Sequence, residues 1–202
     1  LLGSFPSAVW FGKALFGLDV REHGSGIPGA TNTFRVLGKK AGFIVMLGDI
    51  MKGLLAASLA VLLMKLNLIH ADSLINVKLV LGVVAVVGHI FSIFLSFKGG
   101  KGVATLLGMM ISIHYEVALL CVGVFLITLL LTKYVSLASL ISALSFPTFL
   151  LFVPRFQTNE TMLIGFGFFL FIVIVWTHNK NIRRLVDGDE SKTYLIKNQK
   201  KD

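Results

Sequence analysis

Residues 79–95 read LVLGVVAVVGHIFSIFL, and residues 161–176 read TMLIGFGFFLFIVIVW. Neither run contains Asp, Glu, Lys or Arg, and each approaches the roughly 20 apolar residues that a helix needs to cross a bilayer. Backbone groups in hydrocarbon must be hydrogen-bonded within the structure, and continuous apolar runs lack the alternation of barrel strands. Both runs therefore predict transmembrane helices.

The composition of the 202 residues points the same way. Hydrophobic residues make up 55% of the chain and charged residues 14%, whereas a soluble domain carries about 25% charged residues. The net charge of +9 suits anionic headgroups and anionic substrates better than nucleic acid in so apolar a chain. The single cysteine, Cys121, excludes an intramolecular disulfide and has no metal-ligand neighbours at useful spacing. We predict no metal site.

Seven apolar segments follow one another along the chain. They cover residues 1–16, 41–64, 79–97, 103–113, 117–132, 134–153 and 161–177. The polar break at residues 114–116 separates the fourth from the fifth, and a single tilted helix over 103–132 is the alternative. We predict an all-α integral membrane protein with one polytopic domain over 1–202, made of a helical bundle (1–177) and a basic tail (178–202).

Lysine and arginine predict which side of the membrane each connector faces. If the connectors alternate sides, fourteen cations fall on one side and three on the other. The larger group is Arg21, Arg35, Lys39, Lys40, Lys98, Lys101, Lys133, Lys180, Arg183, Arg184, Lys192, Lys197, Lys200 and Lys201, and the smaller is Lys65, Lys78 and Arg155. The positive-inside rule places the larger group in the cytoplasm. Seven spans then put the N-terminus outside and the tail inside.

The first glycine-rich loop, residues 23–32, reads HGSGIPGATN and is followed by Arg35. Its glycines match the spacing of a dinucleotide fingerprint, but that motif needs a strand before it and a βαβ unit around it. Glycines without Cβ atoms let backbone N–H groups approach an anion. If the following helix begins near Thr31, its positive end adds to the site. The loop therefore predicts a phosphate site.

The second loop, residues 97–105, reads FKGGKGVAT. It is no Walker A motif, because Gly102 rather than Ser or Thr follows Lys101. Two lysines among three glycines at the start of a helix suit a phosphate. The alternative is an ordinary cationic turn at the membrane edge. Two such loops on one predicted side favour the anion site.

Three further patches carry polar residues. His178 and Asn181 are three apart after the last apolar segment, so they share a face if the helix continues; ordinary interfacial polarity is the alternative. Asp49 and Lys52, within a predicted span, are also three apart, and a structural salt bridge is the favoured interpretation. His89 is interpreted as a packed, hydrogen-bonded core histidine.

These motifs together resemble the acyl-phosphate-dependent glycerol-3-phosphate acyltransferases of bacteria, the PlsY family. The resemblance rests on LGSFPS at residues 2–7, on the loop at 24–35, and on Gly88-His89 with the loop at 97–105, and it runs to about Leu185. It implies a seven-helix protein of the bacterial plasma (inner) membrane with its active site facing the cytoplasm. It also implies acyl transfer from acyl phosphate to glycerol-3-phosphate, which gives lysophosphatidic acid at the first committed step of phospholipid synthesis.

The resemblance also implies which residues form the site. The catalytic set is Ser25, Arg35, Lys101, His178 and Asn181, and the phosphate-binding set is Gly24, Gly26, Gly29, Thr31, Asn32, Lys98, Gly99, Gly100 and Gly102. No cofactor is implied; the partners are the two substrates, membrane lipids and the synthase that makes the acyl phosphate. Two positions depart from the family pattern: Ile27 replaces a common Asn, and Ser92 replaces a common Pro.

A membrane carrier for a phosphorylated solute is the competing hypothesis. A carrier is expected to show polar groups on both sides and often an internal repeat. Here both phosphate-suited loops lie on one predicted side, and the sequence shows no repeat.

An acyl phosphate carries a good leaving group, so positioning and electrostatic stabilisation supply most of the acceleration expected of an acyltransferase.

Overall fold

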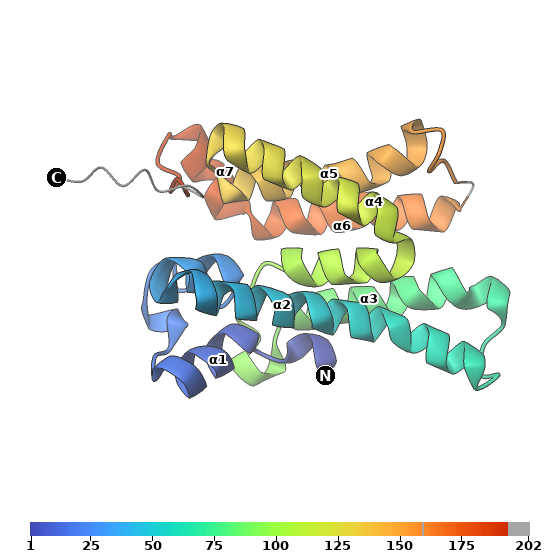
Figure 1. Cartoon of the computed structure of the whole chain (residues 1–202), viewed down its shortest axis with the longest axis horizontal. Helices are drawn as coiled ribbons and strands as arrows, with labels where there is room; N and C mark the ends of the chain where they lie inside the picture. The colour runs from blue at the N-terminus through green and yellow to red at the C-terminus, as the bar shows by residue number, and fades with distance from the viewer. Residues whose placement is uncertain (159, 194–202) are drawn as a thin grey trace. The chain divides into compact units, whose positions relative to one another are not determined.

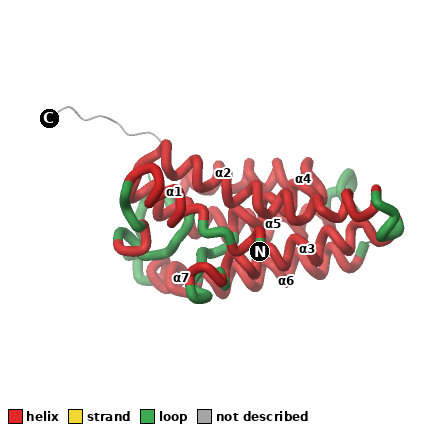
Figure 2. The backbone as a smooth tube through the Cα atoms, turned by 90° about the horizontal axis from the view of Figure 1, so that it is seen from below, coloured by secondary structure: helices red, strands yellow, loops and turns green. Residues whose placement is uncertain are grey.

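The computed structural model describes residues 1–158 and 160–193, and its regular structure in these residues is entirely helical (Figure 2). The predicted all-α class is therefore confirmed for the described chain. By its internal contacts the chain divides into two compact units, residues 1–118 and residues 119 onward. Each unit is described in turn, and the predicted single domain stays a prediction.

The first unit is built around two helices that pack against each other, α2 (Ala30–Lys65) and α3 (Leu74–Ile90). It also contains α1 (Ser7–Phe16) and the first part of α4 (Val103–Thr132), with 3-10 turns η1 (Leu2–Ser4), η2 (Val20–Glu22), η3 (Ala71–Ser73) and η4 (Ile93–Leu95). Helix α3 packs along α2, and α1 and η1 pack beside them (Figure 1). The two loops predicted to bind phosphate precede α2 and α4.

Glycines let α2 and α4 approach each other at backbone distance. A Cβ added to Gly53 would lie 2.0 Å from the carbonyl oxygen of Thr105, and one added to Gly108 would lie 1.9 Å from that of Ile50. Small residues at such crossings are typical of helix packing in membranes. The start of α4 is therefore held closely against the middle of α2.

Two of the long helices are broken locally. Gly38, with φ 84° and ψ −174°, separates a first helical stretch of α2 from the rest of that helix. His114, with φ −149° and ψ 84°, interrupts α4. The predicted break at 114–116 is therefore confirmed, because two helical stretches meet there within α4. The expected early start of the helix near Thr31 is also found, at Ala30.

The second unit contains the remainder of α4, α5 (Val135–Phe152), α6 (Thr161–Thr177) and α7 (Asn179–Val186). Helices α5 and α6 pack together. Gly167 on α6 faces Pro147 on α5, where an added Cβ would lie 2.9 Å from the proline Cβ. Helix α7 turns away from α6 with a bend of 66° at His178.

Four helical segments of the described chain are long and apolar enough to cross a membrane: 30–65, 71–95, 103–132 and 135–152. The bent pair α6–α7 makes a fifth if it counts as one span. Helix α1 has 10 residues, about 15 Å at 1.5 Å per residue, which is half the roughly 30 Å hydrocarbon core. The predicted segment 79–97 also differs, because α3 ends at Ile90. Seven spans and the orientation stay predictions.

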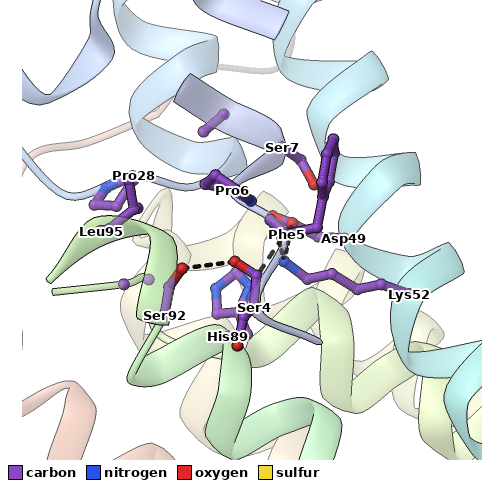
Figure 3. A pocket seen from close by; sticks show the side chains of 13 residues that line it. Ser4, Phe5, Pro6, Ser7, Pro28, Asp49, Lys52, His89, Ser92 and Leu95 are labelled. Carbon is purple, nitrogen blue, oxygen red and sulfur yellow. Dashed lines mark hydrogen bonds and ion pairs between the residues drawn. The ribbon is translucent and has the colours of Figure 1, made fainter. Parts of the chain in front are cut away.

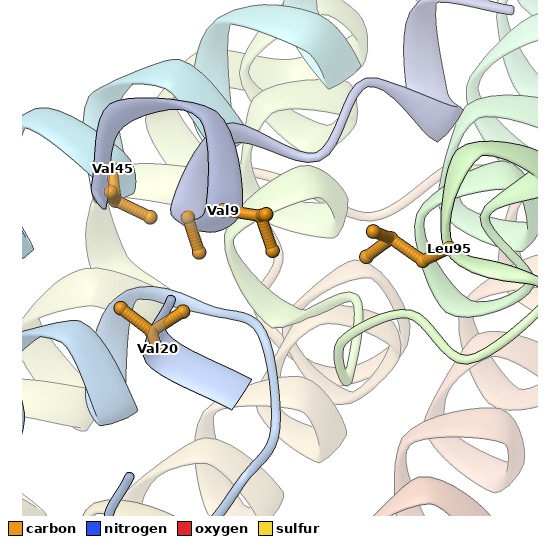
Figure 4. Packing of buried hydrophobic residues seen from close by; sticks show 5 residues of the cluster. Val9, Val20, Val45 and Leu95 are labelled. Atoms are coloured by element: carbon orange, nitrogen blue, oxygen red, sulfur yellow. The ribbon is translucent and has the colours of Figure 1, made fainter. Parts of the chain in front are cut away.

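A small hydrophobic cluster supports the loops of the first unit (Figure 4). It brings together Ala8, Val9, Val20, Val45 and Leu95, all buried. Val20 belongs to the segment before the first glycine-rich loop, and Leu95 to the turn before the second. Because one cluster holds both, the two loops are anchored on the same apolar base.

Candidate functional site

The first loop is held by the buried side chain of Asn32. Its Nδ2 donates to the carbonyl oxygens of Val20, at 2.7 Å, and His23, at 3.1 Å, while its Oδ1 accepts from the amide of Ser25 at 2.9 Å. Both amide hydrogens are therefore used inside the protein. In this conformation Asn32 holds the loop in shape, and its predicted direct contact with phosphate stays a prediction.

Glycines permit the turn that exposes Ser25. Gly24 and Gly26 have φ values of 62° and 70°, which disfavour other residues. A Cβ at Gly24 would also lie 2.4 Å from Asn32 Oδ1. The turn leaves Ser25 exposed, and Arg35 is exposed on the first turns of α2.

The second loop hydrogen-bonds to the end of α3. Gly99 donates its amide to the carbonyl of Ile90 at 2.9 Å, and Gly100 donates to that of His89 at 3.1 Å. These amides satisfy carbonyls that a helix end leaves unpaired. The amide hydrogens of both glycines are used within the protein in this conformation, and their predicted phosphate contact stays a prediction. Lys98 is exposed and Lys101 is partly buried.

The two glycine-rich loops meet at Pro28 and Gly100. A Cβ added to Gly100 would lie 2.6 Å from the carbonyl oxygen of Pro28. Pro28, Gly99 and Gly100 also line one small pocket (Figure 3). The two loops, which lie about 70 residues apart in the sequence, therefore contact each other in the first unit.

Below these loops lies a buried charged cluster. Lys52 Nζ is 2.8 Å from Asp49 Oδ1, which confirms the predicted i,i+3 pair, and it also donates to the carbonyl of Phe5 at 3.0 Å. His89 Nδ1 lies 3.7 Å from the same Asp49 oxygen. The cluster therefore joins α2, α3 and the N-terminal segment.

Three serines line the same pocket, Ser4 and Ser7 of the N-terminal motif and Ser92 after α3, and sequence reasoning assigned them no role. Ser92 Oγ donates to the carbonyl of Ser4 at 2.6 Å, whereas Ser7 Oγ is buried without a hydrogen-bond partner in the described chain. Ser92 occupies one of the two positions that depart from the family pattern. Its hydroxyl ties the turn after α3 to the N-terminal segment, a contact that proline lacks.

The second unit holds the other two predicted catalytic residues, both buried. His178 lies at the bend between α6 and α7, and its Nδ1 is 2.8 Å from the carbonyl oxygen of Ile174. Because a carbonyl only accepts, Nδ1 carries the hydrogen in this contact. Asn181 follows on α7 and donates Nδ2 to Glu190 Oε1 at 2.6 Å.

Glu190 is a centre of hydrogen bonds that the sequence did not reveal. Besides Asn181, it accepts from Ser136 Oγ at 2.8 Å and from Arg184 Nε at 2.7 Å. Burial alone would raise the pKa of this carboxyl, but the three donated hydrogen bonds together lower it below its ordinary value. The ionised carboxylate therefore connects α5 to α7 and sets the orientation of the Asn181 amide.

A second carboxylate anchors the segment before the first loop. Asp19 accepts from the backbone and side chain of Arg21 and lies 3.1 Å from Lys13 Nζ. The Arg21 hydrogen bonds hold the pKa of Asp19 well below its usual range. Within residues 1–158 and 160–193, no three His, Cys, Asp or Glu side chains are grouped to hold a metal ion.

Comparison with known proteins agrees with these motifs. The family model described as "Glycerol-3-phosphate acyltransferase" matches residues 1–188. The chain belongs to the glycerol-3-phosphate acyltransferase family. A family relative from Fusobacterium nucleatum is 40% identical over 191 residues, and one from Chlorobium phaeobacteroides (strain DSM 266) is 39% identical over 216; each alignment covers 95% of this chain and 92% of the relative.

Solved structures of the family show the same fold. The crystal structure of PlsY (YgiH), an integral membrane glycerol 3-phosphate acyltransferase, in its glycerol 3-phosphate form, has a TM-score of 0.83 and 37% identity to this chain. The match covers 96% of this chain and 91% of the solved chain. The lysophosphatidic acid form of that protein has a TM-score of 0.81 at 35% identity. Together with its apolar helices, this places the present chain among integral membrane proteins.

Proposed function

We propose that this protein transfers a fatty acyl group from an acyl phosphate to glycerol-3-phosphate, giving lysophosphatidic acid and phosphate. The observation that carries the proposal is the contact between two basic, glycine-rich loops at Pro28 and Gly100. Both substrates carry a phosphate, and the joined loops bring Ser25, Arg35 and Lys101 to one unit. Family membership and the glycerol 3-phosphate and lysophosphatidic acid forms of the solved relative support the same reaction.

The reaction exchanges one carbon–oxygen bond for another and moves one proton. The glycerol hydroxyl oxygen attacks the acyl carbonyl carbon, the carbon–oxygen bond to phosphate breaks, and the hydroxyl proton ends on the released phosphate. Phosphate is a good leaving group, so holding the reactants and stabilising the developing oxyanion supply most of the acceleration. In this scheme Arg35 grips a phosphate with its planar fork, Lys101 adds a point charge and Ser25 donates a hydrogen bond.

We also propose catalytic roles for His178 and Asn181, because both match motif positions of the family. The hydrogen bond of His178 Nδ1 to the carbonyl of Ile174 fixes the orientation of its ring. The contact with Glu190 likewise fixes which side of Asn181 presents its amide NH₂. We assign both residues to substrate binding and catalysis, at a site that faces the cytoplasm of a bacterial inner membrane.

Purified protein in lipid or detergent tests the proposal directly. Mixing it with acyl phosphate and radiolabelled glycerol-3-phosphate should give labelled lysophosphatidic acid, and acyl-CoA should not replace the donor at a comparable kcat/KM. Equal use of acyl-CoA would contradict the donor assignment alone. Uptake of glycerol-3-phosphate into proteoliposomes without product formation would instead support the carrier and contradict the enzyme.

A further inference from the structure

The buried cluster of Asp49, Lys52 and His89 lies where charges are costly. The three residues have relative exposures of 2%, 6% and 7%, and they belong to α2 and α3, two segments apolar enough to span a membrane. Ionisable side chains at such depth usually serve a site or a partner. A salt bridge accounts for Asp49 and Lys52, but it gives no reason for a histidine beside them.

His89 connects the cluster to the second glycine-rich loop (Figure 3). Its carbonyl accepts the amide of Gly100, and a Cβ on Gly100 would lie 2.3 Å from its Nε2. Its other ring nitrogen faces Asp49 at 3.7 Å, an electrostatic contact longer than a direct hydrogen bond. The imidazole therefore sets how deeply Gly100 sits, immediately before Lys101.

The far end of the loop rests on the same stretch of α2. Gly53 follows Lys52, and it packs against the carbonyl of Thr105 so closely that a Cβ would lie 2.0 Å away. Thr105 is in the first turn of α4, four residues after Lys101. Residues 49–53 thus support the chain on both sides of Lys101.

We propose that Asp49 and His89 are positioning residues for acyl transfer. The Asp49 carboxylate, paired with Lys52, lies beside the His89 ring and orients it by its charge. The ring packs against Gly100 and so seats residues 97–102, which fixes Lys101 at a substrate phosphate. This inference rests on the proposed function, which places a phosphate at Lys101. A displacement of about 1 Å at a site costs up to roughly a hundredfold in rate, so a support outside the reacting groups is expected to matter.

A double-mutant cycle between Asp49→Asn and Lys101→Ala tests the proposal on the full-length protein. With Lys101 present, Asp49→Asn should lower kcat/KM roughly tenfold to a hundredfold. In the Lys101→Ala background the same change should have little effect, because the group being positioned is gone. Equal losses in both backgrounds, as expected of independent effects, would overturn the proposal. Where turnover is below detection, the affinity for glycerol-3-phosphate, measured by calorimetry on the parent, the two single variants and the double variant, provides the same comparison.

Two variants separate positioning from stability. His89→Phe keeps an aromatic ring but removes the ring nitrogens, and it leaves the Asp49–Lys52 pair intact. It should show the same loss of kcat/KM as Asp49→Asn, and it remains a test even if Asp49→Asn folds poorly. Ser58→Ala is the matched control, because it removes a 3.0 Å hydrogen bond from Ser58 on α2 to Ser112 on α4, away from the loop. It should lower the Tm in detergent and leave kcat/KM unchanged.

The outcomes distinguish this inference from the proposed function. Loss of activity in Ser58→Ala equal to that in His89→Phe at the same Tm would contradict positioning. An active parent with an equally active, folded His89→Phe would also contradict it, and would leave the proposed function intact. A parent that binds glycerol-3-phosphate but forms no product would contradict the proposed function instead, while the binding cycle still tests the positioning.

Discussion

At the scale of single residues, exposure separates the side chains available to a substrate from those that build the loop. Ser25 and Arg35 are exposed, while Asn32 is 2% exposed and donates both amide hydrogens to loop carbonyls. The sequence motif contains all three without ranking them. The burial and hydrogen bonds of Asn32 show that it shapes the loop, whereas Ser25 and Arg35 lie at the surface.

Ser25 is expected to stabilise the reaction without becoming acylated. It lies between two glycines with positive φ, and no orienting acid is seen beside His23 in the described structure. Ser25→Ala should lower kcat by about 10²–10³, the loss typical of one stabilising donor. Steady-state kinetics measures the loss, and mass spectrometry of quenched enzyme that traps an acyl-serine at this position would refute the role.

Arg35 and Lys101 are expected to form the cationic half of the phosphate site. Arg35→Lys should lose much activity although it keeps the charge, because a lysine cannot make the bidentate contact. Loss of a charge-assisted contact is worth roughly 1.5–3 kcal/mol, or about tenfold to over a hundredfold in kcat/KM. Lys101→Ala should lose more than its matched control Lys98→Ala, since Lys98 is exposed at the start of the loop. If Arg35→Lys and Lys101→Ala both turned over like the parent, the phosphate site would not lie at these two residues.

At the scale of elements, helix ends depend on partners far along the chain. The apolar run 79–95 continues past Ile90, yet α3 ends there. Its last carbonyls accept the amides of Gly99 and Gly100, and Ser92 bonds to the N-terminal segment. These contacts compete with another helical turn, and hydropathy carries no information about them.

Helix α7 depends on Glu190, and its stability should depend on pH. The folded-state pKa of Glu190 is lowered, so its contribution is fully present above the unfolded glutamate value of about 4.3 and is lost as pH falls through the lower folded value. Glu190→Gln should therefore have a lower Tm than the parent at neutral pH, with a difference that shrinks in acid. Thermal unfolding in detergent across pH 3–7 measures it, and a constant difference would contradict the assignment.

At the scale of the whole molecule, cation distribution predicts a cytoplasmic C-terminal end. In a Cys121→Ala background, single cysteines at Asp187 and Thr158 provide a matched pair on opposite predicted sides of α6. An impermeant thiol reagent applied to intact cells should label position 158 only, and both positions should react after lysis. Labelling of position 187 in intact cells would reverse the orientation.

The sequence by itself determined the helical membrane class, two helices almost to the residue and the family. Predicted segments 134–153 and 161–177 became α5 and α6, at 135–152 and 161–177. Both are continuous apolar runs, a local signal that hydropathy detects directly. The glycine-rich motifs were also recognisable, and Gly24, Gly26 and Gly102 adopt the positive φ values that glycine favours.

Only the tertiary structure decided which residues act together. It joined Pro28 to Gly100, set His89 between Asp49 and the loop, and brought Glu190 to Asn181. It also placed the break within α4 at His114. These features depend on hydrogen bonds and close contacts between segments distant in sequence. Such contacts depend on the packed arrangement of helices, and no local pattern of residue types encodes them.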